Sequence, residues 1–277
     1  MKRKAALVLS SGGARGIAHI GVIRELVANG FEITSVAGTS MGALIGGVYA
    51  AGKLDEFEEW LTSLSRFDMF NLLNLTVSSR GFVKIDKALK EMQKFIPDRK
   101  IEDLPVSFVA VATDISKNKE VVFTKGDLFD AIKASVSIPM LIKPVQKKDT
   151  MFVDGGLMNP VPVNRVARTD GDMLIAVNAN AFISSGRIWE LKNTKLNDLA
   201  DVNRRPGSGY FNLMVKASAI MMNRIMELIF KTTPPDMLIE IPRDVCGVFD
   251  FSKTRELIDL GREIAKEAIA NHREAEG

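Results

Sequence analysis

A serine stands between two glycines in the run Gly38-Thr39-Ser40-Met41-Gly42, directly after an apolar segment. A Gly-x-Ser-x-Gly run between a strand and a helix is typical of a nucleophile elbow, in which a sharp turn lifts the serine hydroxyl off the backbone. The alternative is a serine that only caps the helix. We interpret Ser40 as a nucleophile, with Gly38 and Gly42 clearing space for the turn.

A glycine-rich segment with the letters SSGGARG occupies residues 10–16, between the first apolar run and the first helical pattern. Glycines leave backbone N–H groups open, and the start of a helix adds partial positive charge, so the segment suits an oxyanion or a phosphate. It lacks the Gly-Lys-Ser/Thr of a Walker loop and the spacing of a dinucleotide site. A tight packing turn is an equally good interpretation of these letters alone.

An acidic residue, Asp154, ends a short apolar run and is followed by two glycines. Asp-Gly-Gly alone is typical of a turn. In α/β proteins, however, functional residues gather at the carboxyl ends of the strands. This position makes Asp154 a candidate partner for Ser40.

Only two histidines are available as a base for the serine. His19 follows the glycine-rich segment, and His272 lies five residues from the C-terminus among charged residues. Neither is placed as in a Ser-His-Asp triad, so we predict a Ser-Asp dyad of Ser40 and Asp154. An ordinary aspartate is a weak base for a hydroxyl, and we therefore expect a dry pocket to raise its pKa.

Apolar runs alternate with helical patterns along most of the chain, which favours an α/β sheet covered on both faces. We expect strands near residues 6–9, 33–37, 107–112, 121–124, 151–153, 173–178 and 237–241, and helices near 17–29, 42–50, 128–135, 213–230 and 257–271.

The totals place the chain among folded proteins: 277 residues, 46% of them hydrophobic, with a net charge of +3. We expect one domain over 1–277, with no basic track for nucleic acid. The single cysteine excludes an intrachain disulfide and a cysteine-based zinc site. The apolar run after the basic N-terminus is too short for a signal peptide, and no stretch is long enough to span a membrane. A cytoplasmic protein is the expectation.

Three segments outside these motifs carry alternatives. Residues 57–75 are apolar and irregular, and would either cap the sheet or dip into a membrane surface through side chains such as Phe67. Residues 184–212 are polar and are a candidate mobile lid. The methionine-rich helix 213–230 would either line an acyl-chain tunnel or pack as plain core.

Three motifs in order, GGARG at 12–16, GTSMG at 38–42 and DGG at 154–156, resemble the signatures of patatin-like phospholipases. The letters ASVSIP at 134–139 and the pair Asn159-Pro160 resemble further family elements. The resemblance covers roughly residues 5–180 and is specific, because the motifs occur at family-like spacing.

This resemblance implies a three-layer α/β/α sandwich with a mostly parallel central sheet, and a lipid acyl hydrolase. We expect no cofactor, and no catalytic metal because no carboxylate cluster accompanies Asp114. Ser40 would carry the acyl group and Asp154 would act as the base. The N–H groups of Gly12, Gly13 and Ala14 would form the oxyanion hole. The implied partners are a lipid or acyl-ester substrate and a transient contact with a membrane surface. Supporting roles fall on Arg15, Gly16, Gly38, Gly42, Gly155 and Gly156, and for Arg15 we favour steadying the loop over binding a lipid phosphate.

Two other functions fit the residues. One is a small-ester or thioester hydrolase with a conventional triad through His272. The other is a non-catalytic protein whose glycine-rich segment holds a lipid or anionic head group. Loss of activity on removing His272 would favour the first, and binding without covalent labelling of Ser40 would favour the second.

Overall fold

The computed structural model describes residues 3–73, 86–96, 98–139, 142–183 and 210–276. Within them, eight strands form one sheet with the order β5-β6-β3-β2-β1-β7-β8, and β4 pairs with β3. The strands in parallel pairs are β1 (Arg3–Leu9), β2 (Phe31–Thr39), β3 (Ser107–Asp114), β7 (Met173–Ala181) and β8 (Met237–Pro242). The strands in antiparallel pairs are β4 (Lys119–Phe123), β5 (Val145–Lys147) and β6 (Thr150–Asp154).

The central strand β1 shows why the sheet has a layer on each face. Every residue from Ala5 to Leu9 is buried, as expected for a strand in a parallel sheet covered on both faces. Ala5, Leu7 and Leu9 belong to one apolar core, and Ala6 and Val8 belong to another. Successive side chains of a strand point to opposite faces, so the two cores are the two layers between sheet and helices. The expected α/β/α arrangement with a mostly parallel sheet is confirmed.

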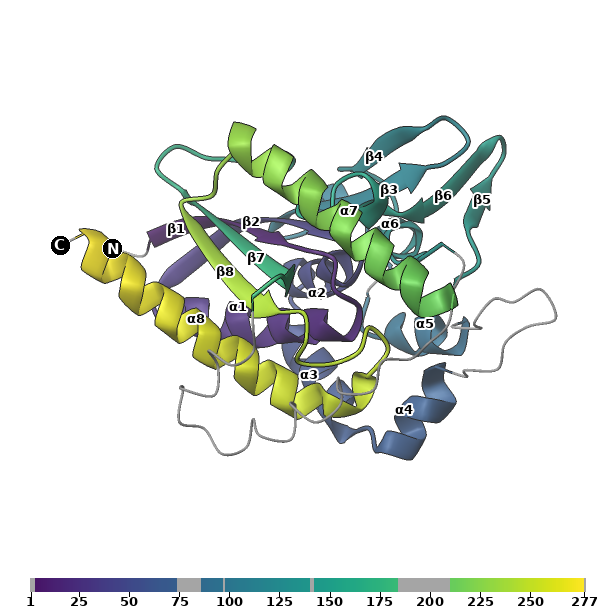
Figure 1. The fold of residues 1–277 in the computed structure, drawn as a ribbon, viewed down its shortest axis with the longest axis horizontal. Helices are drawn as coiled ribbons and strands as arrows, with labels where there is room; N and C mark the ends of the chain where they lie inside the picture. Colours follow the sequence, from purple (N-terminus) through teal and green to yellow (C-terminus); the bar gives the residue numbers. More distant parts are fainter. Residues whose placement is uncertain (1–2, 74–85, 97, 140–141, 184–209, 277) are drawn as a thin grey trace.

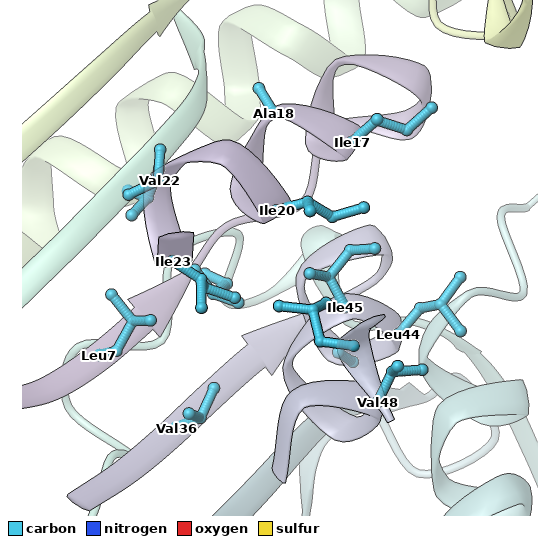
Figure 2. Close-up of a cluster of buried hydrophobic side chains, with 14 of the residues drawn as sticks. Leu7, Ile17, Ala18, Ile20, Val22, Ile23, Val36, Leu44, Ile45 and Val48 are labelled. Atoms are coloured by element: carbon cyan, nitrogen blue, oxygen red, sulfur yellow. The ribbon is translucent and has the colours of Figure 1, made fainter. Parts of the chain in front are cut away.

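Helices α1 (Ala18–Ala28), α2 (Met41–Ala50) and α8 (Thr254–Glu276) form the larger core with one face of the sheet. Figure 2 shows Ile20 and Ile23 of α1 and Ile45 of α2 packed over Leu7 and Val36 of the strands. The other face is covered by α7 (Tyr210–Thr232) and by the segment 161–166. Figure 1 shows α7 crossing one side of the sheet while α1, α2 and α8 lie on the other.

Three helices form a cap beyond α2: α3 (Leu54–Ser63), α4 (Arg66–Leu73) and α5 (Asp86–Met92). Phe57, Leu61 and Leu72 are buried in the core that includes α2, whereas Phe67 is exposed. The prediction of an irregular 57–75 segment is therefore wrong in detail, because this part of the chain is helical up to Leu73. Leu75 lies outside the described residues.

The remaining elements connect these layers. Helix α6 (Leu128–Ser135) has the predicted bounds, and short 3-10 turns occur at η1 (Gly13–Ile17), η2 (Ile101–Asp103), η3 (Gly155–Leu157) and η6 (Phe251–Lys253). Most of the candidate lid, 184–209, lies outside the described residues, and 210–212 begin α7 rather than end a loop. No helix in the described part of the chain is long and apolar enough to cross a membrane.

Candidate active site

Ser40 occupies a strained turn between β2 and α2. Its φ of 56° and ψ of −121° lie in a region that residues with a side chain rarely adopt, at a cost of order 1–3 kcal/mol. Its side chain makes no capping hydrogen bond to α2, so the structure does not support a helix-capping serine. A strained strand-to-helix turn of this kind is the geometry of a nucleophile elbow.

Close backbone contacts hold this turn in place. A Cβ atom on Gly42 would overlap the carbonyl oxygen of Leu9, so only glycine lets α2 approach the end of β1 this closely. The Ser40 N–H donates to Ser135 Oγ at 2.8 Å, and that hydroxyl donates to the Val111 carbonyl at 2.6 Å. Ser135 therefore ties the serine turn to β3, a role that the sequence did not indicate.

The sheet itself brings Asp154 to Ser40. Residues 110 and 111 of β3 pair with both β2 and β4, and residue 112 pairs with both β4 and β6. A strand has two edges, so β6 must continue along the edge of β3 where β2 stops. Thr39 of β2 faces Val111, and Asp154 of β6 faces Ala112. The two strands thus meet end to end, with Ser40 after one end and Asp154 at the other.

Burial and hydrogen bonds set the charge state of Asp154. Burial raises the pKa of its carboxyl to about 6, while hydrogen bonds from the Ser40 side chain and the Gly156 N–H act to lower the pKa. The Gly156 N–H lies 2.8 Å from Asp154 Oδ1. The expected rise in pKa of the buried carboxyl is therefore present, and the Ser40 side chain is one of the groups that act on this carboxyl. Gly155 lies against the Val111 carbonyl, beneath this pair.

In the glycine-rich segment, the Ala14 N–H is already bound to another part of the chain and is not open as predicted. This N–H donates to the Val248 carbonyl at 2.8 Å. Gly13 adopts a φ of +55°, and a Cβ on it would lie 2.5 Å from that same carbonyl oxygen. The predicted oxyanion role of the Ala14 N–H is thus not available in this structure. The N–H groups of Gly12 and Gly13 have no hydrogen-bond partner within the described part of the chain.

Arg15 is buried and points away from solvent. Its Nη1 donates to the carbonyl of Arg243 at 2.9 Å, and its Nη2 donates to Asn180 Oδ1 at 2.6 Å. Burial lowers its pKa to about 10. These contacts agree with a role in steadying the loop rather than in meeting a lipid phosphate.

Asn180 is a second residue that sequence reasoning missed. Its Nδ2 donates to the Ser11 carbonyl at 2.6 Å while its Oδ1 accepts from Arg15. The amide thereby joins residues on both sides of Gly12 and Gly13. The letters NAN at 178–180, polar residues at the end of an apolar strand, were the available signal.

Neither histidine reaches Ser40 as a base would. His19 is fully buried, burial lowers its pKa to about 4, and its Nε2 lies 3.0 Å from the Ser10 carbonyl. His272 precedes Arg273, whose Nη2 donates to the Asn29 carbonyl at the start of β2. Ser40 follows the other end of β2, about 26 Å away at about 3.3 Å per residue. His272 therefore lies near the amino-terminal ends of the strands, opposite the end that carries Ser40, and this position argues against a triad through His272.

An apolar cavity borders both the serine turn and the glycine-rich segment. Met41, which follows Ser40, lines this cavity, and so does Ile17, the last residue of η1. Gly16, also in η1, packs against Met41. The cavity is narrow, with a volume of about 20 Å³. Its lining is entirely apolar and comes from the core and the cap: Ile17, Met41, Leu44, Ile45, Phe57, Leu61, Met69, Leu72, Met92 and Phe251. No α7 residue lines it, so the structure does not support an acyl tunnel along α7 at this cavity.

Among the described residues, no three His, Cys, Asp or Glu side chains gather as metal ligands would.

Known proteins resemble the chain along most of its length. An uncharacterized NTE family protein of Mycobacterium bovis is 30% identical over 96% of this chain and 91% of its own length. Lysophospholipase NTE1 of Coccidioides immitis is 29% identical over 96% of this chain, which corresponds to 18% of that larger protein.

Among solved structures, VipD from Legionella pneumophila matches 98% of this chain and 67% of its own with a TM-score of 0.50 and 14% identity, a likeness of fold alone. The sequence model of the patatin-like phospholipases matches residues 7–167, from the first strand through both glycine motifs and past Asp154. The chain belongs to the patatin-like phospholipase family.

Proposed function

We propose that this protein hydrolyses fatty-acyl esters of lipids, with Ser40 as the nucleophile and Asp154 as the base. The observation that carries the proposal is the junction of β2 and β6, where a serine in a strained turn and a buried carboxyl of raised pKa lie next to each other. Family membership supports a lipid hydrolase in general. The name of the fungal relative, a lysophospholipase, supports a single-chain phospholipid as one substrate to test.

The first half of the reaction forms an acyl-enzyme. Asp154 accepts the Ser40 proton as Oγ attacks the ester carbonyl carbon. The N–H groups of Gly12 and Gly13 donate to the resulting oxyanion. When the tetrahedral intermediate collapses, the C–O bond to the leaving alcohol breaks and Asp154 returns its proton to that alcohol. The ester of Ser40 remains.

The second half releases the fatty acid. Asp154 takes a proton from water, and the water oxygen attacks the acyl-enzyme carbonyl. The bond to Ser40 Oγ then breaks, and Ser40 regains a proton from Asp154. With a pKa of about 6, Asp154 is mostly ionised near pH 7 and still basic enough to receive the proton.

We place the acyl chain in the apolar cavity beside Met41. The cavity adjoins both the nucleophile and the proposed oxyanion donors, and its lining offers an acyl chain no polar partner. Three methionines, Met41, Met69 and Met92, are part of that lining, and methionine adapts its shape readily. The narrow space therefore widens by side-chain movement when a chain enters.

The test is covalent labelling followed by intact-protein mass. Wild type and His272→Ala are each expected to gain one adduct from a long-chain fluorophosphonate, and Ser40→Ala none. Asp154→Asn is expected to react slowly and to lose hydrolysis of a fatty-acyl ester. Labelling of the Ser40 variant, or full hydrolysis by the Asp154 variant, would refute the dyad. Stoichiometric lipid binding without any adduct on folded wild type would favour the binding-protein alternative.

A further inference from the structure

Helix α7 turns an unusual number of apolar side chains to solvent. Ile220 is 61% exposed and Met221 is 57% exposed. A surface helix ordinarily presents a polar face to water, and a large exposed apolar patch marks an interaction site. We define the α7 face as these exposed side chains of the helix: Leu213, Met214, Ile220, Met221 and Leu228.

The opposite side of helix α7 packs beside the candidate active site. The Met222 methyl group lies 3.0 Å from a Cβ position on Gly156, which itself lies 3.1 Å from Asp154 Oδ1. Helix α7 also contacts η3, the turn that follows Asp154. Leu157 and Met158, at the end of that turn, are exposed as well. Exposed apolar side chains therefore occur both on α7 and on the turn beside Asp154, two elements that are in contact.

The charges of α7 favour an anionic partner. Between its ends, Tyr210 and Thr232, the helix carries three basic residues and one acid. Lys216, Arg224 and Lys231 are exposed, and the acid, Glu227, forms an ion pair with Arg224 at 2.8 Å. A helix with exposed apolar side chains and flanking cations is suited to lie in the interface of a membrane that contains anionic lipids.

We propose that the α7 face, together with Leu157 and Met158, docks the protein on an anionic lipid surface. The apolar side chains enter the headgroup region, and the three cations meet lipid phosphates. The helix lies on the bilayer and does not span it. The benefit of docking here rests on the proposed function, because a lipid ester delivered at this surface would arrive near Asp154.

The test uses the full chain and sedimentation with phosphatidylcholine vesicles, with and without phosphatidylglycerol. Wild type is expected to bind the anionic vesicles. The double variant Ile220→Glu with Met221→Glu is expected to lose binding by about tenfold or more, since both side chains lose their burial in the interface.

The matched control is Val27→Glu with Phe67→Glu. It also adds two acids at exposed apolar positions, on α1 and on the cap, and so reproduces the change in net charge. We expect it to bind nearly as wild type does.

Three results would overturn the proposal. Wild type could bind neither vesicle type, or the α7 variant could bind as tightly as the control. Alternatively, wild type could be a dimer in solution and the α7 variant a monomer. Hydrolysis of a soluble short-chain ester is measured in parallel. If wild type binds vesicles through α7 and yet cleaves no ester, the docking surface stands and the proposed function fails.

Discussion

The replacement Asp154→Asn separates the catalytic role of this carboxyl from its cost to the fold. Asparagine keeps the shape of the side chain but cannot accept the Ser40 proton. The proposed mechanism therefore predicts a loss of kcat of about 10²–10⁴-fold, the usual contribution of a general base. In wild type, kcat/KM should fall about tenfold between pH 8 and pH 5, because a carboxyl with a pKa of about 6 is then largely protonated.

The same group should destabilise the protein at neutral pH. Burial raises the Asp154 pKa from 3.8 to about 6, which corresponds to about 3 kcal/mol between folded and unfolded states. Between these two pH values the folded state binds more protons than the unfolded state, so the free energy of unfolding falls as the pH rises. The cost is absent below pH 3.8 and complete above pH 6. Asp154→Asn removes the buried charge and should be more stable than wild type at pH 8, by up to about 3 kcal/mol.

Denaturant unfolding of both proteins at pH 4 and pH 8 measures the effect. The control is Asp172→Asn, because hydrogen bonds with Thr169 and Arg168 lower the Asp172 pKa despite the opposing effect of burial. That variant should be less stable than wild type at pH 8 and should keep its activity. An Asp154→Asn variant that gains no stability between pH 4 and pH 8 relative to wild type would refute the reasoning about the buried carboxylate.

Two further substitutions probe the surroundings of the pair. Asn180→Ala removes the amide that joins Ser11 to Arg15, and kcat should fall about tenfold with little change in KM if the amide positions the Gly12 and Gly13 N–H groups. Asn223→Ala, which removes a half-buried amide on α7 that donates to Glu227, is its control, and equal kcat in both variants would argue against a positioning role. Leu61→Phe narrows the apolar cavity and should lower the rate on long-chain relative to short-chain esters by roughly tenfold, and an unchanged ratio would place the acyl chain elsewhere.

The sheet could be predicted because its strands are short apolar runs with glycine or polar residues at their ends. Helix α6 has the predicted bounds because Asp127 caps its first turn, accepting the Asp130 N–H at 2.7 Å. The cap helix α3 escaped prediction although Leu54, Phe57 and Leu61 repeat at helical spacing and are buried. The surrounding acidic and polar residues made the segment appear irregular.

The environment of the glycine-rich segment could not be predicted from its own letters. Arg15 and Ala14 bind carbonyls of Arg243 and Val248, more than 220 residues away in the chain. Contacts over such a separation depend on the order of strands β1, β7 and β8, which local patterns do not determine. The sequence likewise indicated a methionine-rich helix at 213–230, but not that apolar residues of this helix face outward.

The way β2 and β6 meet explains how two residues could suffice where a triad uses three. A triad histidine spans the distance between an acid and a serine on separate loops. Here both partners follow strands that share one edge of β3, so main-chain hydrogen bonds fix their separation. The strain at Ser40 is held by Ser135 and by the close approach of Gly42 to β1. In the proposed dyad, the backbone supplies the alignment of the aspartate with the hydroxyl, and burial supplies the basicity that an exposed carboxylate lacks.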